Sequence, residues 1–101
     1  MTQVDELVAG IYRISTAAWG FPITLNQFLI AGEHPALIHT GIYPLYEEVK
    51  KAIAQVLDPA RLEYIVVPHF ESDECGGMGR FLADAPKATL VCSEAGAVIN
   101  L

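Results

Sequence analysis

The sequence predicts an α/β fold built on a mixed β-sheet, and three observations support this fold class. Short segments rich in β-branched and aromatic residues, which are typical of strands, recur along the chain. The first of them follow one another closely, as antiparallel strands do, whereas the later ones alternate with segments of helical periodicity. We therefore expect antiparallel strands followed by a β-α-β-α-β-α pattern, with residues 1–101 forming one domain or part of one.

Local patterns place each element in chain order. Strands are expected at five segments: 11–16, 24–31, 36–40, 64–68 and 89–92. A first helix is expected near Pro44, which suits a first helical turn, and it should end before Asp58-Pro59. Two further helices are expected, at residues 75–83 and from about residue 94 onward. The later strands should be parallel, with right-handed crossovers between them.

The composition restricts the class of protein. Hydrophobic residues make up 52% of the chain and charged residues 18%, which excludes a disordered protein. No apolar run is long enough to span a bilayer, and the net charge of −6 argues against nucleic acid or an anionic membrane as a partner. An acidic N-terminus and only two cysteines, Cys75 and Cys92, predict a reduced, cytoplasmic protein without a disulfide framework. So short a chain with so high an apolar content also predicts apolar surface that it cannot bury alone.

One short motif carries the candidate chemistry. His69, Glu71 and Asp73 follow the strand expected at 64–68, each two residues after the last. Alternate side chains of an extended backbone share a face, so these three are expected to converge on one point above the strand end. One imidazole nitrogen and several carboxylate oxygens suit iron or manganese better than an all-sulfur site would. Open α/β sheets place their chemistry at such strand ends.

Each candidate also has a plainer interpretation. The motif fits a solvated loop in which Asp73 caps the following helix. Cys75 fits either a thiolate near a helix start or a small buried residue. Trp19 and Phe21 fit either the rim of a pocket or a loop folded against the sheet or a subunit interface. The residues alone do not separate these alternatives.

With these elements in place, the chain resembles the first half of the metallo-β-lactamase fold, an αββα sandwich. The superfamily signature His-x-His-x-Asp-His corresponds here to His69-x-Glu71-x-Asp73-Glu74. Glutamate at the second position is typical of the flavodiiron branch and of its flavin-free, oxygen-binding di-iron relatives. The resemblance implies that His69 and Glu71 bind one metal and that Asp73 binds the other. It departs from the pattern at Glu74, where a histidine is usual, and at His39, where an aspartate is usual.

The resemblance implies a parent function: a di-metal site, most often two irons, that binds or reduces dioxygen or nitric oxide. Zinc or manganese are the alternative metals. The remaining ligands of the family come from later loops, so we expect the site to be incomplete in this chain, which would be a fragment or need a second chain. Whether this chain is itself an enzyme stays open, as a flavodiiron-like oxidoreductase if complete, and gas sensing is as compatible as turnover. No flavodoxin-like segment is present in these residues, so electrons would come from another domain or protein.

Two other functions remain. The first is a metal-dependent hydrolase of the same superfamily, in which metal-bound hydroxide attacks a small-molecule ester, lactam or thioester. The second is a metal-free interaction module that kept the fold and lost the chemistry. In every case the expected half-sandwich must cover its second face, with the remaining C-terminal half, a different chain or a second copy in a homodimer.

Overall fold

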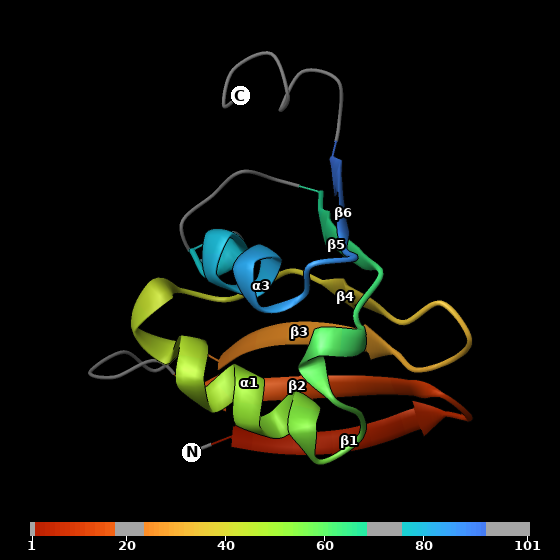
Figure 1. Cartoon of the computed structure of the whole chain (residues 1–101). Helices are drawn as coiled ribbons and strands as arrows, with labels where there is room; N and C mark the ends of the chain where they lie inside the picture. Colours follow the sequence, from red (N-terminus) through yellow and green to blue (C-terminus); the bar gives the residue numbers. More distant parts are fainter. Residues whose placement is uncertain (1, 18–23, 69–75, 93–101) are drawn as a thin grey trace.

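In the computed structural model of the chain, the residues described are 2–17, 24–68 and 76–92, and these form one six-stranded mixed sheet (Figure 1). The strands are β1 (Thr2–Val8), β2 (Ile11–Ala17), β3 (Thr24–Ile30), β4 (Ala36–Ile38), β5 (Tyr64–Val67) and β6 (Thr89–Cys92). The helices of this part of the chain are α1 (Tyr46–Ala54) and α3 (Met78–Asp84), with short 3-10 turns at η1 (Tyr43–Leu45) and η2 (Pro59–Arg61). None of these helices is long and apolar enough to cross a membrane.

The strands lie in the sheet in the same order as in the chain, from β1 to β6. The pairs among β1, β2, β3 and β4 are antiparallel, whereas β4 pairs with β5 and β5 with β6 in parallel. This confirms the mixed α/β fold expected from the sequence. Because β4, β5 and β6 are parallel neighbours, their carboxyl ends lie at one end of the sheet, which we call the carboxyl end.

Two elements differ from the sequence-based expectation. The strand β1 was not expected, because its polar residues Asp5 and Glu6 hide the alternation of a strand. It is an edge strand that pairs only with β2, and charged side chains are common on such edges. The helix α3 begins at Met78 rather than near residue 75, because Gly76 and Gly77 form a turn. The helix expected from residue 94 lies outside the described residues.

Both helices cover the same face of the sheet (Figure 1). Right-handed crossovers that step in one direction across the sheet, from β4 to β5 to β6, place their helices on one side. The core lies between this face and the helices, where Leu37, Ile65 and Val67 are fully buried. The helices contribute Val49, Ile53 and Phe81 at 0% exposure.

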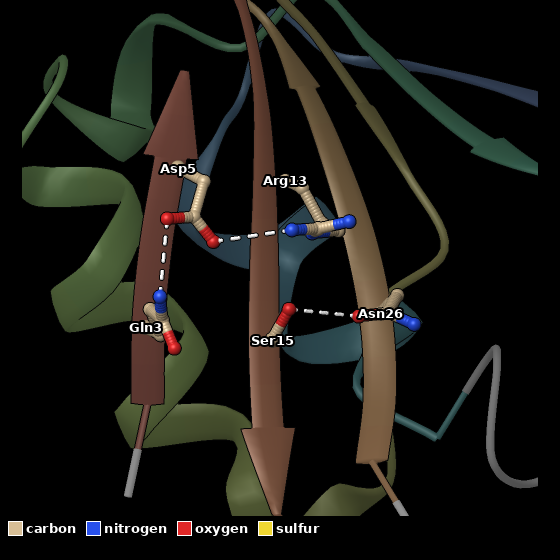
Figure 2. Close-up of polar contacts among 5 residues, drawn as sticks. All are labelled: Gln3, Asp5, Arg13, Ser15 and Asn26. Carbon is tan, nitrogen blue, oxygen red and sulfur yellow. Dashed lines mark hydrogen bonds and ion pairs between the residues drawn. The ribbon is translucent and has the colours of Figure 1, made fainter. Parts of the chain in front are cut away.

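The other face of the sheet, which we call the open face, carries no helix of the described chain. Polar side chains of β1, β2 and the first part of β3 lie on it. Figure 2 shows these polar contacts. Arg13 Nη2 lies 3.4 Å from Asp5 Oδ2, and Gln3 Nε2 donates a hydrogen bond to Asp5 Oδ1 at 3.1 Å. Ser15 Oγ donates a hydrogen bond to Asn26 Oδ1 at 2.8 Å.

Toward the parallel strands the open face becomes apolar. Alternation along the strands places a set of side chains there that are half-buried or exposed: Phe28, Ile30, Ile38, Tyr64, Val66 and Val91. Tyr64, on the inner strand β5, is 40% exposed, and Val91, on the edge strand β6, is 41% exposed. An apolar face of this kind is typical of an interface rather than of a free surface.

A substitution at Gly41 tests whether the left-handed backbone that follows β4 matters for stability. Its φ is +77°, and an added Cβ would lie 3.2 Å from Nε2 of the buried Gln27. We expect Gly41→Ala to lower the free energy of unfolding by about 1–2 kcal/mol, because L-residues are strained in left-handed conformations. Gly32→Ala is the control, since an added Cβ there meets nothing within 4 Å. Urea denaturation of the native gene product measures both; equal stabilities of the two variants would contradict the expectation.

Candidate metal centre

The predicted ligands His69, Glu71 and Asp73 lie in segment 69–75, outside the described residues, as do Glu74 and Cys75. Their convergence therefore stays a prediction. Within residues 2–17, 24–68 and 76–92, no group of three or more His, Cys, Asp or Glu side chains could hold a metal ion. Trp19 and Phe21 also fall outside the described part of the chain.

The strand β5 leads directly into segment 69–75 and is firmly held. It lies between β4 and β6, with Ile65 and Val67 buried against the helices. Beyond the last residue of β4, the backbone N–H of His39 donates a hydrogen bond to the carbonyl oxygen of Val66 at 2.9 Å. The pairing of β4 and β5 thus continues to the carboxyl end of the sheet, three residues before His69.

On the other side of segment 69–75, the turn before α3 is held by the residues that directly follow β4. The backbone N–H of Gly77 donates a hydrogen bond to Oγ1 of Thr40 at 3.1 Å, and Thr40 is 0% exposed. A Cβ on Gly77 would lie 3.2 Å from the carbonyl oxygen of Thr40, so glycine permits this close approach. The sequence predicts Thr40 only as the last residue of a strand, because this hydrogen bond spans 37 residues.

The turn at residues 39–41 has an unusual backbone. His39 has a φ of 65° and Gly41 a φ of 77°, so left-handed residues flank Thr40. A left-handed conformation is rare for residues other than glycine, although histidine, asparagine and aspartate adopt it more readily than most. His39 was expected to lie within a strand; instead it follows β4. Backbone strain of this kind persists only where the surrounding contacts determine it.

A second set of contacts fixes α3 against α1. The guanidinium carbon of Arg80 lies 4.3 Å from the ring centroid of Tyr46 and 5.9 Å from that of Tyr43. Arg80 also lies 3.5 Å from a carboxylate oxygen of Glu47. Beneath it, the rings of Tyr46 and Phe81 meet edge to face with centroids 4.8 Å apart. These contacts orient the helix that follows segment 69–75.

Arg80→Ala should lower the free energy of unfolding by about 1 kcal/mol, because it removes a cation–π contact and an ion pair that are both partly exposed. Arg61→Ala is the charge-matched control. It also removes one arginine, but Arg61 is an exposed residue of η2 that makes none of the contacts described for Arg80. Thermal unfolding of both variants, with salt varied, gives the comparison. An Arg80→Ala variant as stable as Arg61→Ala would show that the stacking contributes nothing measurable.

The other two histidines of the chain lie apart from each other. His34 sits in the turn before β4, at the end of the sheet opposite the carboxyl end, and its Nδ1 is 3.0 Å from a carboxylate oxygen of Glu63. Its side chain is 69% exposed, as befits a surface residue. Of these two described histidines, His39 is the one at the carboxyl end. Cys92 is half-buried at the end of β6 and is a free thiol.

The donor chemistry of the predicted ligands fits a non-haem iron site. Imidazole together with carboxylates is a set that binds iron or manganese, and it lacks the thiolates of most structural zinc sites. The described residues add a rigid support on both sides of segment 69–75. The donor atoms of the predicted ligands therefore suit iron, the metal that the family resemblance implies.

Comparisons with known proteins agree with this fold. The family model described as "ODP family beta lactamase" matches residues 23–99. The chain is 29% identical to a nitric oxide reductase of Moorella thermoacetica, over 93% of this chain and 27% of the relative. It is 32% identical to the flavo-diiron protein FprA2 of Clostridium acetobutylicum, over 72% of this chain and 18% of that protein. The chain thus spans about a quarter or less of the length of these relatives.

Solved structures show the same architecture. The rubredoxin oxygen:oxidoreductase of Desulfovibrio gigas superposes with a TM-score of 0.88 at 23% identity, covering 95% of this chain and 27% of that one. A metallo-beta-lactamase from Cronobacter sakazakii gives a TM-score of 0.80 at 22% identity, covering 95% and 36%. At such identities these likenesses show the fold alone. Together with the family match over residues 23–99, they show that the chain is an N-terminal part of the metallo-β-lactamase fold and belongs to the ODP family of beta-lactamase-like proteins.

Proposed function

We propose that this chain carries the first ligand cluster of a di-iron site that binds or reduces dioxygen or nitric oxide. The observation that carries the proposal is the spacing His69-x-Glu71-x-Asp73 just beyond β5, whose Ile65 and Val67 are buried under the helices. The similarity to a nitric oxide reductase and a flavo-diiron protein supports it. Residues 1–101 form one partial domain in this proposal, and later residues or a second chain supply the other ligands.

Each part of the chain has a task in this proposal. His69 and Glu71 hold one metal and Asp73 the other, and iron, when bound, supplies the redox chemistry. The sheet and α3 fix the two flanks of the ligand segment, so that its donors need little reorganisation. Electrons reach the site from another domain or a donor protein, since these residues show no flavodoxin-like segment. We place this chemistry in the cytoplasm, in keeping with a chain that has only two cysteines.

A hydrolase is the second candidate, and the description of the matching family as a beta lactamase favours it. Hydrolases of this fold activate water on zinc, usually with a second histidine where this chain has Glu71. A carboxylate at that position shifts the donor set away from zinc and toward iron. The departures at Glu74 and His39 favour the third candidate, a metal-free interaction module.

Metal analysis of the protein purified from its native source separates the three candidates. Iron near two equivalents per complete site, with consumption of dioxygen or nitric oxide when a reductant is supplied, is the expected result. Zinc with hydrolysis of an ester, lactam or thioester would replace the proposal by the hydrolase. A native protein that contains no metal and takes up none would leave the interaction module. The intact mass of the same preparation shows which further residues accompany this chain.

A further inference from the structure

The ligand segment 69–75 is flanked by two hydrogen bonds that end on neighbouring residues of a single turn. On the β5 side, the N–H of His39 donates to the carbonyl oxygen of Val66 at 2.9 Å. On the α3 side, the N–H of Gly77 donates to Oγ1 of Thr40 at 3.1 Å. His39 and Thr40 are adjacent in sequence, so the turn at residues 39–41 ties together both flanks of the segment.

We infer that Thr40 is a positioning residue for the metal ligands, an inference that rests on the proposed function. Its hydroxyl holds the turn before α3 at a fixed place relative to β5, and this sets the span that residues 69–75 must bridge. A segment whose ends are fixed loses less conformational freedom when its side chains bind a metal. Hydrogen bonds that orient ligand-bearing segments support affinity in this way.

The surroundings of Thr40 make the hydrogen bond effective. Thr40 is 0% exposed, so water does not compete for the Gly77 N–H. The left-handed backbone on both sides, at His39 and Gly41, limits how far the turn can shift. The close approach of Gly77 to the Thr40 carbonyl favours a residue without a Cβ, because an added Cβ would lie 3.2 Å from that oxygen. The packing of Arg80 on Tyr46 then holds the rest of α3 against α1.

Two substitutions separate the effect of the Thr40 hydroxyl from the effect of its side-chain volume. Thr40→Val keeps the volume but removes the acceptor for the Gly77 N–H, whereas Thr40→Ser keeps a hydroxyl. Asp58→Ala is the matched control, because it also removes a side-chain acceptor from a backbone N–H: Asp58 Oδ1 accepts from Ala60 at 3.0 Å. That hydrogen bond lies on η2, which is not part of the turn at residues 39–41.

Three measurements on the native gene product test the inference: affinity for ferrous iron and for zinc by chelator competition, amide exchange at Gly77 without metal, and thermal unfolding without metal. We expect Thr40→Val to bind metal at least about tenfold more weakly, as variants that disturb the supports of metal ligands do. Gly77 exchange should accelerate in the same variant. Thr40→Ser should stay within about threefold of the wild type in affinity, and Asp58→Ala should lose thermal stability alone.

Distinct outcomes overturn the two proposals. A wild-type protein that takes up no metal overturns the proposed function and this inference with it. A wild-type protein that binds metal, with a folded Thr40→Val variant of equal affinity, overturns only the role of Thr40. So does a Thr40→Ser variant that is as weak as Thr40→Val. If Thr40→Val does not fold, Gly77→Ala takes its place, since its Cβ would press on the Thr40 carbonyl oxygen at 3.2 Å; unchanged affinity there also overturns the inference.

Discussion

Replacement of His69 by alanine is expected to abolish metal binding in the native gene product, with a loss of affinity above about 100-fold. His69 supplies the only nitrogen donor of the predicted cluster, and carboxylates alone do not replace an imidazole at a site of this kind. The metal-free protein is expected to change little in stability, because the role predicted for His69 is to bind the metal. Elemental analysis and chelator titration measure the loss, and thermal unfolding without metal checks the fold.

The chain provides a matched control for this variant. His34→Ala also removes one histidine, but its side chain is 69% exposed and pairs with Glu63 at the far end of the sheet. Its metal content should therefore equal that of the wild type. A His69→Ala variant that keeps full metal content would disprove the site assignment, and so would equal losses in both variants.

The chain of residues 1–101 taken by itself is expected to associate through the open face of its sheet. The helices cover one face, while the other exposes apolar side chains of β3 to β6, among them Tyr64 and Val91. A sheet must bury its second apolar face, and an obligate interface of this kind buries roughly 2,000 Å² or more. Candidates for the cover are the remaining part of a longer polypeptide, a different chain or a second copy. Light scattering at micromolar concentration should show dimers or larger species rather than an 11 kDa monomer.

Charges placed on the open face should reverse this association. Ile38 and Val66 are register partners on β4 and β5 and are half-buried on that face. The double variant Ile38→Lys, Val66→Lys is expected to shift the chain toward monomers. The control adds the same charge to the exposed end of α1, as Ala54→Lys with Gln55→Lys, and should associate like the wild type. A folded wild-type chain that stays monomeric would contradict the prediction that the open face must be buried against another chain or segment.

Much of the fold could be predicted because its signals are local. Strand segments such as Tyr64–Val67 combine β-branched and aromatic residues, and their position between helical segments indicates parallel pairing. The edge strand β1 escaped prediction for the opposite reason. Its polar residues carry little strand propensity, and it is a strand because β2 offers a partner. Pairing with a neighbour outweighs weak local preference.

For the candidate site, the kinds of donor and their spacing could be predicted from the sequence, because His69, Glu71 and Asp73 are close in the chain. It also placed them just after the strand at residues 64–68. The contacts on both sides of segment 69–75 emerged only from the tertiary structure. The hydrogen bond from Gly77 to Thr40 and the stacking of Arg80 on Tyr46 join residues more than thirty positions apart. Local preferences reach only a few residues along the chain, whereas such contacts depend on how whole elements pack.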